Sequence, residues 1–387
     1  MSAIERAKKD KYVGIVIHAN AMLFSNGITQ NAYFIYQCLT HCRFKCKFLC
    51  NEEVTQPFAH KGIPVKQMST NPELFNASEF HTIITVTRNM AHDMKLLFKK
   101  HHTRIIGFVC GNHYMKDQEI FLNGSSESTF CGQDKISDEL WIIPFLEYSL
   151  EYFKTLRRVP ARVVPHLWSP SLLNERALKL SNKTERELMY DTVKHSGKKI
   201  EIVIMEPNVS IVKTAWLPII ASERLFQEHP ELVEFVFVFN YPIHNSSWAM
   251  TDNLTLGNKL RRFKRLEMDQ IFSHFNVQDT IPIFLSHQVD NSLNYLYYEL
   301  LHYGYPLVHN SPDLENCGYF YPQSNILKCV ESILDAYNNH NTNIDVYRQN
   351  AAAYLSKIDP ESAIMSKTWT QLIDAGLEAE LGNNPVK

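Results

Sequence analysis

The sequence lacks a long apolar run and a surplus of either charge. No window offers ~18 uncharged apolar residues, the length that a membrane-spanning helix needs. The opening MSAIERAKKDKYVGIVIHAN has neither the apolar stretch nor the small-residue cleavage site of a signal peptide. The 39 Lys and Arg residues nearly balance the 41 Asp and Glu residues. We therefore expect a cytoplasmic globular protein with no nucleic-acid partner and with peripheral membrane contact at most.

The eight cysteines lack the spacing of a metal site. Cys38, Cys42, Cys46 and Cys50 recur at every fourth residue, whereas zinc ligands usually occur as close pairs separated by a long gap. The segment also passes from a helical to a strand pattern between Cys42 and Cys46, so four thiols would not converge on one ion. We expect buried, reduced thiols and no metal cofactor.

The 387 residues exceed one ordinary core, and this length favours two domains. Short apolar runs alternate with helical periodicity, which is typical of parallel α/β sheets. One series runs from YVGIVIHA (12–19) to ARVVPHLW (161–168), and a second begins at IEIVIMEP (200–207). We predict two doubly wound Rossmann-like domains, residues 1–171 and 200–358, with a connector at 172–199 and a helical segment at 359–387. Ligands of such sheets bind at the carboxyl ends of the strands.

One unusual stretch, NSLNYLYYELLHYGYPLVHNS (291–311), predicts a helix followed by a strand. We expect Gly304 to end the helix, and Asp290 or Asn291 to cap its start. The free N–H groups of Ser292 and Leu293 would then form an anion site. The alternative is that the polar residues form an ordinary solvated face. The expected buried face consists of Leu293, Leu296, Tyr297, Leu300 and Leu301.

The same stretch resembles the second-domain signature of GT-B glycosyltransferases. Glu299 falls on the second glutamate of that signature, and YGYPLVHNS falls on its Gly-x-Pro strand. Asn291 stands at the first acidic position, which is a departure from the pattern. MEPNVSIVKT (205–214), VPHLWSP (164–170) and GYPLVHNSP (304–312) are similar to uncharacterised bacterial and large-virus GT-B-like proteins. The resemblance covers residues 12–370 and implies two domains facing a central cleft, with the last helix returning to the first domain.

The resemblance also implies roles for residues of the second domain. Lys213 matches a lysine that holds the donor diphosphate, Asn208 replaces the arginine that precedes it, and Glu299 would bind the ribose. Stabilising charge on the leaving phosphate is the main catalytic requirement. No Asp-x-Asp metal motif stands where one is expected. The candidate donor contacts are Asn208, Lys213, His287, Asp290, Asn291, Ser292, Leu293, Asn294, Glu299 and His309.

The first domain offers candidates for the acceptor side. Gly27 would let the backbone approach a ligand closely. His113 follows a strand and suits a general base in an inverting enzyme; otherwise it orients the donor or is a structural histidine. With Lys213 and Asn291 it completes the catalytic candidates. The acceptor candidates are Asn26, Gly27, Gln30, Asn31, Asp117 and Glu119.

Two other features have structural and functional interpretations. The basic run in NKLRRFKRLEMDQ (258–270) predicts the exposed face of an amphipathic helix at 257–272, with a membrane or nucleic-acid surface as the alternative. Trp168 and Trp248 are expected to pack in the core, and stacking on a sugar or base is the alternative.

Together these observations predict a metal-independent GT-B glycosyltransferase. It would move a hexosyl or pentosyl unit from a UDP- or GDP-linked donor to an oligosaccharide or glycoconjugate acceptor. Nucleotide-sugar 2-epimerases use the same scaffold, so an epimerase is one alternative. The other is a non-catalytic nucleotide-sugar or glycan-binding module, which the Asn208 and Asn291 departures favour.

Overall fold

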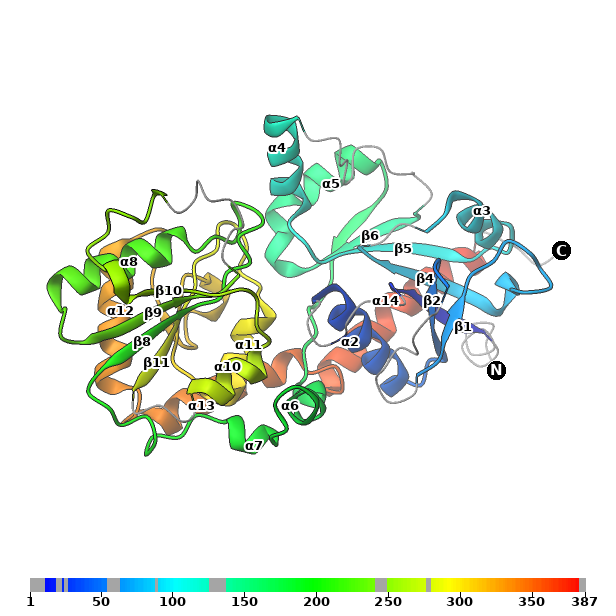
Figure 1. The fold of residues 1–387 in the computed structure, drawn as a ribbon. Helices are drawn as coiled ribbons and strands as arrows, with labels where there is room; N and C mark the ends of the chain where they lie inside the picture. Colours follow the sequence, from blue (N-terminus) through cyan, green and yellow to red (C-terminus); the bar gives the residue numbers. More distant parts are fainter. Residues whose placement is uncertain are drawn as a thin grey trace. The chain divides into compact units, whose positions relative to one another are not determined.

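The computed structural model describes residues 11–18, 23, 27–53, 63–87, 90–124, 137–240, 249–275 and 280–382. The chain divides into two compact units (Figure 1). Unit 1 comprises residues 1–169 and 356–387, and unit 2 comprises residues 170–355. The structure therefore groups the whole of the expected connector, including α6 (Leu173–Ser181) and α7 (Glu185–Leu188), with unit 2.

Unit 1 is built on a seven-stranded parallel sheet, sheet A, in the order β3-β2-β1-β4-β5-β6-β7. Chain order reverses direction between β1 and β4, which is the switch point of a doubly wound sheet. The strands are β1 (Tyr12–Val16), β2 (Cys46–Cys50), β3 (Val65–Gln67), β4 (Phe80–Val86), β5 (Arg104–Val109), β6 (Glu139–Ile142) and β7 (Ala161–Val163).

Helices cover both faces of sheet A. Phe98 on one helix packs with Phe75 and Phe80 in an aromatic cluster on one face. On the other face Trp369 lies 5.5 Å from Trp141 and 6.4 Å from Phe108, ring centroid to centroid. The helices of unit 1 are α2 (Gly27–His41), α3 (His92–Lys100), α4 (His113–Asn123), α5 (Leu150–Arg157) and α14 (Ala363–Gly382).

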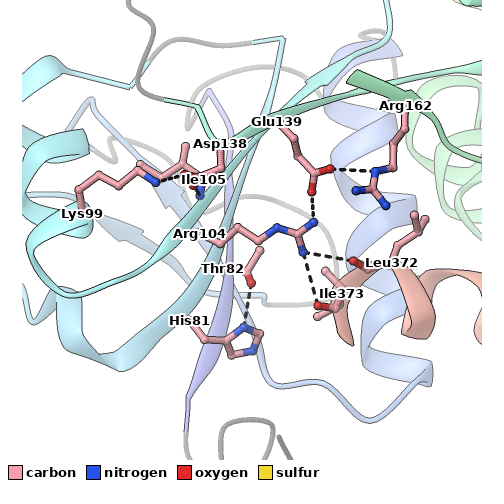
Figure 2. Close-up of polar contacts among 10 residues, drawn as sticks. All are labelled: His81, Thr82, Lys99, Arg104, Ile105, Asp138, Glu139, Arg162, Leu372 and Ile373. Carbon is pink, nitrogen blue, oxygen red and sulfur yellow. Dashed lines mark hydrogen bonds and ion pairs between the residues drawn. The ribbon is translucent and has the colours of Figure 1, made fainter. Parts of the chain in front are cut away.

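The last helix, α14, lies beside α2 (Figure 1) and is held by polar as well as apolar contacts. Arg104, at the start of β5, donates to the carbonyl of Leu372 at 3.1 Å and pairs with Glu139 (Figure 2). Arg162 lies 2.9 Å from the other oxygen of Glu139. A buried guanidinium thus has partners on both the sheet and α14, as a buried charge requires.

Unit 2 repeats the architecture with a six-stranded parallel sheet, sheet B, in the order β10-β9-β8-β11-β12-β13. Its switch point lies between β8 and β11. The strands are β8 (Ile200–Ile204), β9 (Val233–Val238), β10 (Leu260–Arg262), β11 (Ile281–Leu285), β12 (Leu307–His309) and β13 (Tyr319–Phe320).

Alternate residues of the central strands pack on opposite layers of helices. Ile202 and Ile283 belong to the core shared with α8 and α12, which lie together on one face (Figure 1). On the opposite face of sheet B, Phe284 contacts Phe272 and Tyr305. Besides α6 and α7, the described helices of unit 2 are α8 (Trp216–Glu228), α10 (Met268–Phe275), α11 (Tyr295–Tyr303), α12 (Ile326–Asn339) and α13 (Ile344–Leu355). Short 3-10 helices are η1 (Ala77–Glu79), η2 (Pro144–Ser149), η3 (Pro170–Leu172), η4 (Gly257–Lys259), η5 (Pro312–Leu314) and η6 (Ser356–Ile358).

The prediction of a basic helix at 257–272 was wrong. The basic run forms η4 and the edge strand β10, and the helix begins only at Met268. Of the apolar side chains expected to face inward on such a helix, Leu260 is buried, whereas Phe263 and Leu266 are 40% and 41% exposed. The Arg261 guanidinium lies 4.6 Å from the ring centroid of Phe235 on β9. Charged side chains on an edge strand discourage pairing with other chains.

The cysteine segment passes from helix to strand as predicted, with Cys38 in α2 and Cys46–Cys50 forming β2. The cysteines in the described part of the chain are free thiols, and Cys38 and Cys50 are buried. No group of three or more His, Cys, Asp or Glu residues within the described ranges is placed to hold a metal ion. Among the helices described, none is long and apolar enough to span a bilayer.

Candidate functional site

The loops that follow β8 and β11 lie side by side at the carboxyl end of sheet B. Lys213 and Gln288 form an antiparallel bridge pair, and the Val289 N–H donates to the Val212 carbonyl at 2.9 Å. These two loops flank the switch point of the sheet. Ligands of open α/β sheets bind at this position, so we take it as the candidate site.

A third loop, after β12, fixes the loop after β11. The Asn310 side chain donates to the Gln288 carbonyl at 2.7 Å and accepts from the Gln288 N–H at 2.9 Å. The Ser311 hydroxyl donates to the Ser292 carbonyl at 2.9 Å. Three successive strand ends are therefore joined by hydrogen bonds, and the site has a defined backbone.

Asn208, predicted as a donor contact, shapes the first of these loops. Its amide nitrogen donates to the carbonyls of Glu206 and Asn240 at 2.8 and 3.1 Å, and its oxygen accepts from the Ala215 N–H at 2.7 Å. Its φ of 53° is left-handed, a conformation that asparagine tolerates better than most residues. The side chain is therefore used by the turn that presents Lys213.

Lys213 is half-buried in this loop, and Glu206 beneath it is fully buried. One oxygen of Glu206 accepts from the Ser286 hydroxyl and, at 3.3 Å, from the His287 N–H. Burial raises the pKa of Glu206 to about 7, although Ser286, Lys213 and the His287 N–H each favour the charged form. The loops after β8 and β11 are thus joined through a carboxyl group as well as through the backbone.

The helix in the stretch 291–311 begins later than predicted. Asn294 is its cap, accepting from the Leu296 N–H at 3.2 Å, and α11 starts at Tyr295. Ser292 and Leu293 belong to the loop, so their N–H groups are not the helix terminus. Asn291 donates to the Leu293 carbonyl at 2.7 Å and to the Gln288 side chain. Asn291 therefore stabilises the loop and Asn294 caps the helix, so the first helical turn begins at Tyr295.

Asp290 is exposed, with a left-handed φ of 45°. Gly304 ends α11 with a φ of 78°, as predicted. Of the expected buried face, Leu293, Tyr297, Leu300 and Leu301 are buried and Leu296 is half-buried.

Glu299 does not face a ligand, and its prediction as a ribose contact was wrong. It is 4% exposed, and Arg176 of α6 donates to both its oxygens, at 2.8 and 2.7 Å. Arg176 also lies 2.5 Å from Asp269, whose pKa burial raises to about 6. A bidentate pair of this kind uses the carboxylate fully. Glu299 is therefore part of a buried ion cluster that holds α6 against α10 and α11.

The two histidines predicted as donor contacts are hydrogen-bonded inside unit 2. His309 is fully buried, with Nε2 2.7 Å from the Cys317 carbonyl and Nδ1 accepting from the Ser311 N–H at 3.1 Å. His287 lies 3.0 Å from the Tyr321 hydroxyl and 3.4 Å from that of Ser324. Burial lowers the pKa of both histidines to about 4. The prediction for His309 was wrong, because both its nitrogens are used.

In unit 1, His113 begins α4 at the carboxyl end of β5, as expected. Burial lowers its pKa to about 4, so the ring is neutral at pH 7 and a weak base. Asp117, one turn later, accepts from the Tyr152 hydroxyl at 2.6 Å, and Glu119 is half-buried on the same helix. A pKa so far below 7 disagrees with the prediction of a general base poised near neutral pH.

Near the first strand, Gly27 opens α2, and Asn31 donates to its carbonyl at 2.8 Å. Gln30 and Asn31 are buried at 6% and 5% exposure. Trp168 is buried at 2% exposure, in agreement with core packing. The candidates Asn26 and Trp248 lie outside the described residues.

Sequence reasoning missed Glu206, Ser286 and Gln288. Each follows within three residues of the end of a central strand, which is the signal that could have found them. Two of their buried polar atoms, Glu206 Oε2 and Gln288 Nε2, have no hydrogen-bond partner in the described part of the chain. Unsatisfied buried polar groups are rare in proteins and need an explanation. Here they mark the edge where sheet B is expected to bind ligands.

Comparison with known proteins gives a family and a fold. A family model described as "Protein of unknown function (DUF2827)" matches residues 13–373. None of the curated proteins matches the sequence. The fold is similar to sucrose-phosphate synthase from Thermosynechococcus elongatus, with TM-score 0.60, 10% identity, 95% of this chain and 100% of that chain covered.

Two other similar structures contain UDP or a UDP-sugar. Anabaena Alr3699/HepE in complex with UDP-glucose has TM-score 0.58 and 9% identity, covering 94% of this chain and 99% of that one. An α-glucosyltransferase in complex with UDP and a 13-mer DNA containing an HMU base has TM-score 0.57 and 11% identity, covering 95% and 99%. The chain thus has the GT-B fold, with two parallel-sheet α/β domains, as its sequence predicted.

Proposed function

The chain belongs to the DUF2827 family of proteins of unknown function, and we propose its activity from the fold and from the site at the carboxyl end of sheet B. The activity is transfer of a sugar from a UDP- or GDP-linked donor to a glycan acceptor, without a metal ion. The observation that carries this proposal is the bridge pair of Lys213 with Gln288. It presents a cation at the switch point of a GT-B sheet, where a diphosphate would bind.

Lys213 would act by stabilising the leaving group. When the bond between sugar and diphosphate breaks, negative charge builds on the departing phosphate, and a fixed cation lowers the energy of that transition state. Lysine binds phosphate as a point charge, which suits a charge shared by several oxygens. We propose that Lys213 supplies this charge in place of a metal ion, and that turnover persists in excess chelator.

The acceptor would be oriented by unit 1, at the carboxyl end of sheet A. His113 and Asp117 lie one turn apart on α4 at this edge. Because its pKa is about 4, the neutral His113 ring would hydrogen-bond an acceptor hydroxyl and hold it in position. Replacing His113 with glutamine should therefore raise the KM for the acceptor more than it lowers donor hydrolysis.

A panel of nucleotide sugars tests the proposal. Wild-type protein should bind UDP or GDP in a thermal-shift screen, because a ligand of the native state raises its melting temperature. It should also hydrolyse the matching labelled sugar donor slowly. Lys213→Met keeps the aliphatic stem and should weaken diphosphate binding about 10- to 100-fold, the range of one charge-assisted contact. Lys264→Met is the matched control, since Lys264 is an exposed lysine of the same unit.

A non-catalytic nucleotide-sugar-binding module is the second candidate. It is favoured by Asn208, which occupies the arginine position of the GT-B pattern and is used by its own loop. Tight binding with no turnover in the same assay would support the module. An isomerised donor would indicate an epimerase, and no binding by the wild-type chain would overturn all of these assignments.

A further inference from the structure

Glu206 is the only carboxyl group among the described residues that touches the loop after β11 from the loop after β8. It follows β8 by two residues and is fully buried. Its Oε1 accepts from Ser286 and from the His287 N–H, so it spans the switch point below Lys213. Oε2 has no partner in the described part of the chain. A buried carboxyl group with one unsatisfied oxygen is costly, and this cost needs a compensating role.

The contacts of Glu206 extend into the helix and strand behind the site. The Ser286 hydroxyl lies 2.7 Å from the Tyr297 hydroxyl on α11. The Tyr321 hydroxyl, just after β13, donates to the Ser286 carbonyl at 2.9 Å. A change in the protonation of Glu206 therefore reaches the hydrogen bonds that position both loops.

The charge of Glu206 depends on the groups that face it. These are Lys213 from the loop after β8, the His287 N–H from the loop after β11, Tyr297 from α11 and Tyr321 after β13. Among them Lys213 is the only cation. A diphosphate on Lys213 would bring two negative charges to the ammonium that now stabilises the Glu206 anion. Like charges disfavour one another's ionised forms, so the carboxyl would gain a proton.

We propose that Glu206 is a positioning residue of the donor site, which joins the loops after β8 and β11 and takes up a proton from solvent when a diphosphate binds at Lys213. The inference rests on the proposed function, because it requires a diphosphate at Lys213. The pKa of about 7 in the ligand-free protein agrees with it, since the carboxyl then titrates at the pH where the ligand is offered.

Proton uptake makes binding pH-dependent with a defined sign. Affinity falls as the pH rises through the pKa of the free protein, by at most about tenfold per unit for one proton. Wild-type Kd for UDP-glucose or GDP-mannose should rise about 10-fold between pH 7 and pH 8.5. These diphosphates lack a terminal phosphate, whose own ionisation near pH ~6 would complicate UDP.

Glu206→Gln and Glu201→Gln are the matched variants. Glutamine imitates the protonated Glu206, so E206Q should bind the sugar nucleotide with one affinity at all these pH values. Glu201 is a buried carboxyl group whose pKa is also raised by burial. It lies at the opposite end of β8, away from the candidate site. E201Q should keep the wild-type pH dependence. Calorimetry of the wild type in two buffers of different ionisation enthalpy measures proton uptake directly and needs no variant.

The outcomes separate this inference from the proposed function. Binding whose pH dependence is equal in wild type and E206Q, or calorimetry showing no proton uptake near pH 7, overturns the role of Glu206 and leaves the donor site standing. If neither UDP-glucose nor GDP-mannose binds the wild-type chain at any pH, the proposed function fails, and the role of Glu206 fails with it.

Discussion

Replacing Arg176 with methionine should destabilise unit 2 by leaving Glu299 and Asp269 buried without a counter-ion. Methionine keeps most of the aliphatic volume, so the change tests charge more than packing. All three residues are at most 4% exposed, and three short contacts join their side chains: Nη1 and Nη2 to Glu299 at 2.8 and 2.7 Å, and Nε to Asp269 at 2.5 Å.

The size of the effect is set by how the two carboxylates neutralise themselves. Removing one partner of a buried ion pair costs about 3–5 kcal/mol. The variant can avoid a larger penalty by taking up protons, and protonating a carboxylate of ordinary pKa at pH 7 costs about 4 kcal/mol. Protonating Asp269 at pH 7 costs about 1 kcal/mol more, because its pKa is already raised to about 6. The free energy of unfolding should therefore fall by about 3–5 kcal/mol at pH 7.

Urea unfolding of the wild type and Arg176→Met at pH 7, 6 and 5 measures this effect. Burial without a counter-ion favours the protonated form of a carboxyl group, so the deficit should shrink as the pH falls toward 5. Arg176→Met with Glu299→Gln should recover part of the loss. Glu299→Gln alone should reduce stability and change the Kd for UDP less than about twofold. A loss below about 1 kcal/mol, or one that is independent of pH, would refute the assignment; so would an E299Q variant that is fully stable but binds UDP tenfold more weakly.

Three further outcomes follow from other parts of the molecule. Trp369→Ala should lower the unfolding free energy of unit 1 by about 3–5 kcal/mol; a loss under 1 kcal/mol in urea unfolding would mean that α14 is not docked. The pKa values of His309 and His340 are both lowered to about 4 by burial, so stability should be lost as pH falls from 6.5 to 4, by about 1.4 kcal/mol per unit for each ring. Unfolding midpoints that stay constant over this range would contradict it. Asn310→Ala removes both hydrogen bonds to Gln288 and should cost about 1–3 kcal/mol and weaken donor binding; an Asn310→Ala protein with unchanged thermal stability and Kd would contradict it.

The sequence predicted the sheets well because periodicity records burial. Every strand of sheet B except β10 coincides with an apolar run bounded by turn residues. The helix prediction at 257–272 was wrong because its leucines and Phe263 recur at helical spacing. The segment instead pairs with β9, where Arg261 stacks on the Phe235 ring. Tertiary pairing decided that segment, and no local pattern encodes it.

The strand-end loops were predicted in position, and the contacts of their residues were predicted less well. The loops with Lys213 and Asn291 lie at the expected strand ends, but Glu299 and His309 turn inward. A helix presents polar residues on a face that the sequence cannot assign to solvent or to a partner, and the partner of Glu299 is Arg176, 123 residues earlier. Long-range ion pairs of this kind leave no signal in a single sequence. Glu206 was missed because a carboxyl group shortly after a strand looks like an ordinary loop residue in the sequence.

The chain enters unit 2 after Ser169 and leaves it after Leu355, so unit 1 is interrupted by a whole domain. During synthesis, unit 2 emerges from the ribosome before α14 does. Trp141 and Phe108 therefore lack their contact with Trp369 at that stage. The first segment therefore keeps an uncovered apolar surface until α14 has been synthesised. Recombinant fragments that stop before α14 should inherit the same uncovered surface permanently, and a soluble version of unit 1 would need its final helix grafted on by a short linker.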